Sequence, residues 1–590
     1  MKKTKPLLLI ALAVFAAYAP TLRDGFVWDD QALVLRDPLI RSWRLIPEGF
    51  QHFLFTDATP SDFYRPMQRL TYTLEYCAVA FRPAVFHFTN IICHLAASLA
   101  VYFFASELLR FLNAHEKWRN RVALIASVFW AVHPTNSSAV IYISGRADPL
   151  AAAFGFAGLY CAMRSLRATQ LPRTLLIITA TVAFLLSALS KEMGLIYPLL
   201  WLVIVLISAN WNARRNAVGI LIFVSVVYFS LRLPAEHVAT PQSHASLPLL
   251  VRPILVARAV AEYSGVLIFP RNLYMDRDVE TSPSGFVQSS VTEVSRRELQ
   301  TLGGLLLIAG AIYAIVRFRK DNAILVCAIL TLVSYLPVSG IFALNATVAE
   351  HWMYLPSAFL FLTICLIVHG FLEKRQNVSN MFVPVAWLCI AFLAARTFVR
   401  TFDWKDQRTF LERNVRQGGD SSRMLTNLGG LELAEGNLAA AQKHLQLALQ
   451  RDPDQPFALI NLAAVAIKQG DYKTAHETLT RAQQSPLVEA KAHELLAVLE
   501  SKETGNANLL RMRLASRTGP PDWAIEKRYI KVLDEVGPPE RAISELKLCL
   551  GTQWYRAESW QMLSELLTKT GQRDAAVRAH AIAQDFDVHL

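Results

Sequence analysis

The sequence has few cysteines, and their spacing indicates neither a metal site nor a disulfide framework. Seven cysteines are spread over 590 residues, and no two of them form a CxxC pair. A zinc site and a disulfide scaffold are therefore not indicated. The sequence also lacks an HExxH motif, a nucleophile elbow and a P-loop. Metalloprotease, serine hydrolase and nucleotide-driven mechanisms are left without support.

Charged residues are scarce as well, at 18% of the chain, whereas 53% of the residues are hydrophobic. The apolar residues concentrate in the first two thirds of the chain, which indicates a polytopic membrane protein with a soluble tail. The net charge of +12 would also suit a nucleic-acid partner. Many of the basic residues stand in short clusters between apolar runs, however, and the positive-inside rule explains that distribution better. We therefore expect a lipid bilayer around the chain and no nucleic acid.

The first twenty residues have a basic start, an apolar middle and no clear small-x-small cleavage site. We interpret them as an uncleaved first transmembrane helix with a cytoplasmic N-terminus. About eleven spans are predicted in all, at residues 7–22, 86–109, 122–142, 148–163, 174–190, 194–209, 217–233, 302–316, 323–338, 353–371 and 381–398.

On this topology every cytoplasmic connection carries Lys or Arg, as the positive-inside rule requires. Residues 249–270 are apolar enough to span but contain Arg252, Arg258 and Glu262. A crossing there would reverse the later basic loops, so we expect this segment to be re-entrant or packed laterally in the bundle. The long loop 23–83 and the C-terminal tail then lie outside the cytoplasm.

From about Ser421 the sequence repeats with a period of 34 residues. The repeat is typical of tetratricopeptide helix pairs, with glycine at the turn and small alanines where the second helix packs. It predicts an α-solenoid whose concave face holds a polypeptide, with a scaffolding or dimerising array as the plainer alternative. The units around 490–515 are degenerate. The equivalent positions are Asn427 and Asn461, Leu428 and Leu462, Gly436 and Gly470, Ala441 and Ala475, Ala448 and Ala482, and Gly537 and Gly571.

Ionisable residues of both signs fall at the predicted outer ends of the spans, and such residues at membrane depth are candidates for function. Several also suit helix caps, internal ion pairs or a loop anchor. The adjacent carboxylates in GFVWDD are harder to explain structurally, because they repel each other unless a proton, cation or substrate separates their roles. The residues are Asp29, Asp30, Asp62, Arg65, His133, Arg146, Asp148, Lys191, Glu192, Asp276, Glu350 and His351.

A carboxylate near the outer surface, nearby cations and a lateral apolar groove suit a substrate with a long lipid and a phosphate headgroup. The carboxylate would deprotonate an acceptor hydroxyl as a general base, while the cations neutralise the departing lipid phosphate.

A succession of motifs, followed by the 34-residue repeats, resembles one family over nearly the whole chain. The family is that of the transmembrane and tetratricopeptide-repeat O-mannosyltransferases, which are C-type glycosyltransferases that use lipid-phosphate sugars. The motifs are GFVWDD, FYRPMQRLTYTLEY, FHFTNIICHL, AVHPTNSSAVIYISGRADPLAA, LSKEMGLIYP, YSGVLIFPRNLYMD and LPVSGIFALNATVAEHWMYLPS.

The resemblance implies an all-α fold, with a C-type membrane helix bundle of about eleven spans followed by a tetratricopeptide-repeat solenoid. It implies that Asp29 and Asp30 are catalytic, one of them as the base in an inverting transfer from a polyprenyl-phosphate sugar. It assigns donor-phosphate binding or site architecture to Arg65, Arg146, Asp148, Lys191, Glu192, Glu350 and His351.

Two departures from the family pattern concern this site. Trp28 precedes the acidic pair where the family has tyrosine or an equivalent aromatic residue. His351 stands where the family commonly has arginine, so phosphate binding there would depend on pH. We expect no cofactor beyond the lipid-linked donor substrate and no protein-bound metal site, although the sequence leaves a requirement for a divalent metal open.

The sequence thus predicts a membrane glycosyltransferase domain at 1–400, a linker at 401–420 and an extracytoplasmic repeat domain at 421–590. We expect a multi-pass protein of a bacterial inner membrane with the repeats in the periplasm. Its partners would be a polyprenyl-phosphate sugar and a protein acceptor whose Ser or Thr receives the sugar. The alternatives are a non-catalytic scaffold for an envelope complex and transfer to a glycolipid or polysaccharide.

Overall fold

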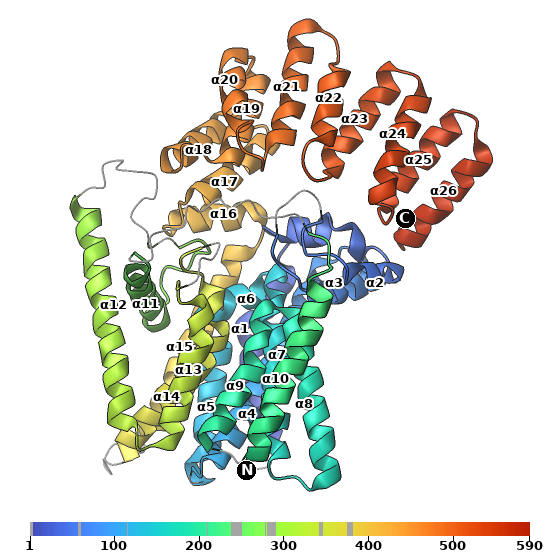
Figure 1. Cartoon of the computed structure of the whole chain (residues 1–590). Helices are drawn as coiled ribbons and strands as arrows, with labels where there is room; N and C mark the ends of the chain where they lie inside the picture. The colour runs from blue at the N-terminus through green and yellow to red at the C-terminus, as the bar shows by residue number, and fades with distance from the viewer. Residues whose placement is uncertain are drawn as a thin grey trace. The chain divides into compact units, whose positions relative to one another are not determined.

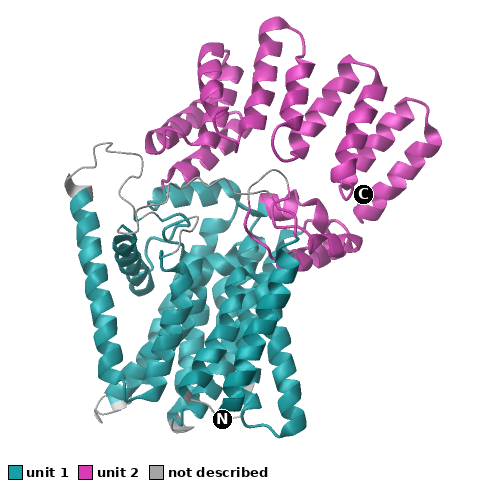
Figure 2. Ribbon diagram, viewed as in Figure 1, with its two compact units in different colours: residues 1–30, 82–234, 244–419 teal, residues 31–81, 235–243, 420–590 magenta. Residues whose placement is uncertain are grey.

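The computed structural model describes residues 4–56, 61–114, 116–208, 211–237, 251–277, 279, 291–341, 346–373 and 381–590. Helices account for the regular secondary structure of these residues, which contain two isolated bridges and no strand. The predicted all-α class is therefore confirmed. The chain forms two compact units (Figure 2): unit 1 from residues 1–30, 82–234 and 244–419, and unit 2 from 31–81, 235–243 and 420–590.

Unit 1 contains the long apolar helices (Figure 1). Short 3-10 turns separate several of them and carry many of the motif residues. The α-helices are α1 (Thr4–Tyr18), α4 (Pro83–Phe111), α5 (Glu116–Val132), α6 (Ser137–Ile141), α7 (Ala147–Ser165), α8 (Gln170–Ser190), α9 (Ile196–Ser208), α10 (Trp211–Arg232), α11 (Arg252–Ile268), α12 (Val291–Phe318), α13 (Asn322–Tyr335), α14 (Tyr354–Glu373), α15 (Phe382–Thr401) and α16 (Gln407–Arg416). The 3-10 turns are η1 (Ala19–Arg23), η5 (Pro134–Asn136), η6 (Ile143–Arg146), η7 (Glu192–Leu195), η8 (Leu336–Val338), η9 (Glu350–Met353) and η11 (Phe402–Trp404).

Seven helical segments of the described residues are long and apolar enough to cross a membrane. The other four predicted spans fall on α5, α7, α9 and α13, which do not meet both criteria of length and composition. A membrane helix bundle is thus confirmed, while the number of eleven crossings stays a prediction. The seven segments are Lys5–Arg23, Pro83–Phe111, Gln170–Ser190, Trp211–Arg232, Val294–Phe318, Glu350–Leu372 and Phe382–Trp404.

The predicted span at 122–142 is too long, because α5 ends at Val132. Proline clashes with the preceding residue in a helical conformation and has no backbone N–H to donate. His133, which precedes Pro134, is accordingly extended, with φ −70° and ψ 129°. The chain continues as η5, α6 and η6, so the predicted second half of this span becomes a set of short turns.

The charges of α11 have protein partners. The Arg258 guanidinium is 3.0 Å from the Glu298 carboxylate and donates to the Thr301 hydroxyl at 2.9 Å. Both partners belong to α12, which packs along α11. Residues 249 and 250 of the predicted re-entrant segment lie outside the described residues.

Unit 2 contains five successive helix pairs, in which each first helix packs on the second. The region around 490–515, which looked degenerate, forms a pair like the others. The pairs are α17 (Ser422–Ala434) with α18 (Leu438–Arg451), α19 (Pro456–Gln469) with α20 (Tyr472–Ala482), α21 (Glu489–Thr504) with α22 (Leu509–Arg517), α23 (Trp523–Val536) with α24 (Pro539–Thr552), and α25 (Ala557–Lys569) with α26 (Arg573–Phe586).

The 34-residue period has a local cause at each turn. Gly470 ends α19 in the left-handed conformation with φ +79°, which costs glycine little because it has no Cβ. Asp471 then caps α20 by accepting the N–H of Thr474, as Asn437 does for Ala440 one period earlier. The repeated sequence positions are therefore the stop and start signals of the helices.

Unit 2 also contains residues 31–81 of the long predicted outer loop. Arg69 is buried at the centre of this segment, and its guanidinium is 2.9 Å from the Asp37 carboxylate. It also donates to the carbonyl oxygens of Gly49, His52 and Phe53 at 2.7–3.0 Å. One arginine thus joins the residue that caps η3 to the backbone of residues 49–53. The elements here are η2 (Gln31–Leu35), η3 (Pro38–Ile40), η4 (Trp43–Leu45), α2 (Ile46–Gly49) and α3 (Pro66–Val79).

Candidate active site

The acidic pair follows the first apolar helix of unit 1 on a strained stretch of backbone. Trp28 has φ +50°, which is unusual for a bulky side chain and persists only where surrounding contacts enforce it. Its N–H donates to the Gln407 side-chain oxygen at 2.6 Å, and its ring meets the Phe410 ring edge to face at 5.3 Å. The N–H of Gly25 donates to the Lys405 carbonyl at 2.8 Å. Residues around α16 therefore fix the conformation of GFVWDD.

Asp30 is fully buried, and its carboxylate is held by three hydrogen bonds. It accepts the N–H of Val27 at 3.0 Å, and the N–H and hydroxyl of Ser144 at 2.8 and 2.6 Å. Burial raises the pKa of Asp30 to about 7, while the bonds from Ser144 and Val27 oppose that shift. A carboxylate enclosed in this way orients the backbone around it.

Asp29 is only half buried, and Tyr142 holds it. The N–H of Asp29 donates to the Tyr142 hydroxyl at 2.9 Å, and that hydroxyl hydrogen bonds the Asp29 side chain. The Tyr142 ring lies 5.4 Å from the Trp404 ring. The two neighbouring carboxylates therefore have different environments, one enclosed and one accessible.

Arg146 holds the turn that supplies Tyr142 and Ser144. It is fully buried and donates to the Asn90 side-chain oxygen at 2.6 Å and to the Phe86 carbonyl at 2.8 Å. The Asn90 amide in turn donates to the carbonyl oxygens of Val140, Tyr142 and Ile143, at 2.8–3.4 Å. These contacts are those of site architecture, one of the two roles expected of Arg146.

Asp148 and Lys191 form an ion pair of 2.6 Å, in which both side chains are largely buried. Lys191 follows α8 and precedes η7, which begins with the half-buried Glu192. Gly194 allows this tight turn, because a Cβ there would lie 2.2 Å from the Ser187 carbonyl oxygen. Two residues far apart in the sequence are thus brought together on α7 and at the end of α8.

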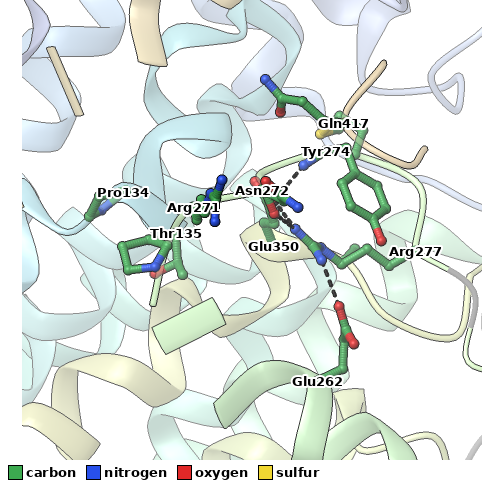
Figure 3. Close-up of polar contacts among 12 residues, drawn as sticks. Pro134, Thr135, Glu262, Arg271, Asn272, Tyr274, Arg277, Glu350 and Gln417 are labelled. Atoms are coloured by element: carbon green, nitrogen blue, oxygen red, sulfur yellow. Dashed lines mark hydrogen bonds and ion pairs between the residues drawn. The ribbon is translucent and has the colours of Figure 1, made fainter. Parts of the chain in front are cut away.

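Glu350 lies in a buried network of charges (Figure 3). Its carboxylate accepts the N–H of Tyr274 at 2.8 Å and the Arg277 guanidinium at 3.0 Å. Arg277 also binds Glu262 of α11 at 2.6 Å. Arg400 approaches the other carboxylate oxygen of Glu350 at 3.9 Å, and Arg400 Nη2 has no hydrogen-bond partner. Glu350 and Arg277 therefore link α11, η9, α15 and residues 274–277.

His351 and Arg65 have different surroundings. His351 is half buried beside Glu350 in η9, and its ring lies 6.2 Å from that of Trp352. Arg65 belongs to unit 2, where it precedes α3 and its guanidinium lies 4.3 Å from the centre of the Phe63 ring.

The sequence interpretation missed several residues of this site. Tyr142, Ser144 and Asn90 lie inside the quoted motifs, so the motifs were the available signal. Arg277 directly follows the motif that ends in NLYMD. No sequence signal indicated Arg400, because a basic residue at the end of a span is expected from membrane topology alone. Among the described residues, no group of three or more His, Cys, Asp and Glu side chains is arranged to hold a metal ion.

Comparisons with known proteins concern the repeats and the overall sequence. A tetratricopeptide repeat family matches residues 432–499, which confirms the predicted repeats. The chain is 26% identical over 458 residues to the protein O-mannosyl-transferase F38B6.6 of Caenorhabditis elegans, covering 76% of this chain and 62% of that protein. It is 24% identical over 520 residues to the protein O-mannosyl-transferase TMTC3 of Homo sapiens, covering 80% and 54%.

The chain is thus similar in sequence to protein O-mannosyl-transferases over 76–80% of its length. The resemblance inferred from the motifs is thereby confirmed. The Drosophila melanogaster protein O-mannosyl-transferase Tmtc3 is 24% identical over 551 residues, covering 80% of this chain and 58% of that protein. This chain therefore spans little more than half the length of these relatives. Among solved structures, the tetratricopeptide-repeat protein YrrB is 16% identical, covering 30% of this chain and 91% of that chain, with a TM-score of 0.21.

Proposed function

We propose that this protein is a membrane glycosyltransferase that moves a sugar from a polyprenyl-phosphate donor to a Ser or Thr hydroxyl of a protein. The observation that carries the proposal is the unequal pair of carboxylates in a relative of the protein O-mannosyl-transferases. Asp30 is enclosed by Val27 and Ser144, whereas Asp29 is half buried beside Tyr142. A general base must reach its substrate, so the accessible carboxylate suits that role.

In this mechanism the Asp29 carboxylate takes the proton of the acceptor hydroxyl. The oxygen of that hydroxyl attacks the anomeric carbon of the sugar at the same time. The bond between that carbon and the phosphate oxygen breaks, and the lipid phosphate leaves with the bonding electrons. A single displacement of this kind inverts the anomeric configuration. Asp30 holds the backbone that positions Asp29, because its own carboxylate is already bonded on three sides.

The leaving lipid phosphate requires cations, which stabilise its charge as it develops. Lys191 can supply one only if the phosphate competes with Asp148, its partner at 2.6 Å. Arg65, Arg146 and His351 remain proposed contributors, with Glu350 and Glu192 as their supports. The predicted groove would accommodate the lipid within the bilayer.

The repeat array would choose the protein acceptor. Helix-pair arrays of this kind bind extended polypeptide on a concave surface. The proposed setting is a bacterial inner membrane, with the acidic pair and the array on the periplasmic side. The positive-inside distribution of Lys and Arg supports that orientation.

Intact-mass comparison of envelope proteins tests the proposal. Cells that express the wild-type chain should contain proteins heavier by single hexose increments, and cells without the gene should lack them. Expression of the Asp29→Asn variant at equal membrane abundance should not restore the increments. Unchanged protein masses together with an altered glycolipid would replace the protein acceptor by a lipid one. Restoration of the hexose increments by Asp29→Asn would show that Asp29 is not the base.

A further inference from the structure

The last helix of the repeat array packs on the outer-loop segment of unit 2, although the two are far apart in the sequence. Tyr555 lies buried in one apolar cluster with Leu39 and Leu45, and Phe586 of α26 packs against that cluster. His52 adds an edge-to-face contact with Tyr555, at 5.3 Å between ring centres. Residues at the end of α26 thus cover apolar residues of the loop.

Polar contacts surround this apolar cluster on the side of η4. The Ser42 hydroxyl donates to the Asp585 carbonyl at 2.8 Å, and the Arg44 guanidinium is 2.6 Å from the Asp585 carboxylate. The N–H of Val588 donates to the Arg41 carbonyl at 3.2 Å. Backbone and side-chain bonds therefore fix the register between the end of α26 and η4.

A second set of polar contacts joins α3 to the residues after α26. The buried Tyr76 donates its hydroxyl proton to the Asp587 carboxylate at 2.7 Å, and its carbonyl oxygen lies 2.7 Å from the His589 ring. The His589 ring also meets the Tyr76 ring edge to face at 5.1 Å. The contact between array and loop is thus apolar at its centre and hydrogen-bonded on two sides.

The loop segment held in this way continues directly from the acidic pair. Asp30 is followed at once by η2, and Asp37 then caps η3 through the N–H of Leu39. Asp37 also binds Arg69 of α3. Asp30 is therefore adjacent in sequence to the segment that α26 covers.

We propose that the end of the repeat array is a positioning element for sugar transfer, because residues 585–589 hold the outer loop in the conformation that the acidic pair requires. The last step rests on the proposed function, whereas the fastening of the loop is a property of unit 2 alone. On the proposed function the acceptor binds to other residues of the array, so loss of this contact would lower kcat and leave the acceptor KM unchanged.

Charge reversal with rescue tests the contact in the full chain, reconstituted in lipid nanodiscs. Arg44 and Asp585 are both about half exposed, at 50% and 49%, so their substitution is compatible with folding. In Arg44→Asp and in Asp585→Arg, we expect faster hydrogen exchange in peptides from 31–56 and 61–81 and a kcat about 3- to 10-fold lower. The double variant R44D/D585R should restore both.

The control reverses an ion pair of the array that does not involve the loop. Lys569 lies 2.6 Å from Asp534, and Lys569→Asp should change neither loop exchange nor kcat. Tyr76→Phe, which removes only the hydroxyl bonded to Asp587, should lower kcat with the acceptor KM within about two-fold of wild type.

The outcomes separate this proposal from the proposed function. Loop exchange that is unchanged in both single variants, or that the double variant does not restore, overturns the positioning role even if the wild type transfers sugar. A raised acceptor KM with unchanged kcat also overturns it. If exchange responds and is rescued while the wild-type protein transfers no sugar, the proposed function fails and the fastening of the loop stands.

Discussion

The Asp30 carboxylate accepts both the backbone N–H and the hydroxyl of Ser144, a residue 114 positions further along the chain. The motif GFVWDD and the motif that contains GRAD are thereby joined at one buried group. This contact gives the two carboxylates of the pair their different environments, and the following predictions test that difference and the network around it.

Ser144→Ala should destabilise the protein through Asp30. Loss of the hydroxyl leaves a buried carboxylate with one fewer donor, and a hydrogen bond to a charged group contributes about 1.5–3 kcal/mol. The free energy of unfolding in mixed micelles should fall by that amount above about pH 8, where Asp30 is ionised. Ser165→Ala is the control, because that buried hydroxyl donates to the Ala162 carbonyl of its own helix. Equal losses of unfolding free energy in the two variants would show that the contact with Asp30 stabilises the protein no more than an ordinary hydroxyl-to-carbonyl hydrogen bond.

The contribution of Asp30 to stability should fall as the pH rises from about 4 to about 7. The pKa of Asp30 is raised to about 7 by burial, above the value of about 3.9 in an unfolded chain. The folded state then binds more protons in this interval, so unfolding becomes easier as the pH increases. Asp24, whose pKa burial also raises to about 7, contributes in the same direction.

Asp30→Asn isolates the contribution of Asp30 to that pH dependence. The slope of unfolding free energy against pH between 4 and 7 should be shallower in Asp30→Asn than in the wild type. The matched variant Asp62→Asn changes an exposed carboxylate and should keep the wild-type slope. An identical slope in all three proteins would contradict the raised pKa.

Glu350→Gln should be among the most destabilising single changes in unit 1. Glu350 is buried against Arg277 and near Arg400, so its neutralisation leaves these two buried cations with one carboxylate each, Glu262 and Asp403, at a cost of about 3–5 kcal/mol. Glu412→Gln, which breaks only surface pairs with Arg408 and Arg416, should cost less than about 1 kcal/mol. Comparable thermal midpoints for the two variants would rule out the buried network as a source of stability.

Asp148 and Lys191 should be coupled in a double-mutant cycle. Lys191→Met and Asp148→Asn each remove the 2.6 Å partner of a largely buried charge, whereas the double variant removes both charges. We expect a coupling energy of about 1–3 kcal/mol in unfolding. Strictly additive changes in unfolding free energy would mean that the two residues are not coupled. A donor KM that is raised by Lys191→Met but not by Asp148→Asn would show that Lys191 binds the lipid phosphate.

The helices of this protein were predictable because hydropathy and a 34-residue period are local signals. Gly470 and Asp471 illustrate the point, since the repeat positions are the helix stop and start themselves. The end of α5 was mispredicted although Pro134 is visible in the sequence, because the apolar run continues beyond it. The composition of the sequence predicts where a span lies, but the steric effect of residues such as proline determines where its helix ends.

The candidate site was predictable only in part. The motif residues Asp29 and Arg146 could be named, but the tertiary partners Tyr142 and Asn90 depend on contacts across the bundle. Arg277 and Arg400 meet at Glu350 through the fold alone. Likewise, no sequence period places Asp585 beside Arg44, since packing between distant segments has no local pattern.

The central claim is that Asp29 is the base for sugar transfer, and single-turnover kinetics test it most directly. Purified wild-type, Asp29→Asn and Glu412→Gln proteins would be given a polyprenyl-phosphate sugar and an acceptor protein, and the rate of hexose addition measured by intact mass. We predict that Asp29→Asn lowers the transfer rate about 10²- to 10⁴-fold at an unchanged unfolding free energy, while Glu412→Gln transfers at the wild-type rate. A transfer rate within two-fold of wild type for a well-folded Asp29→Asn protein would contradict the account.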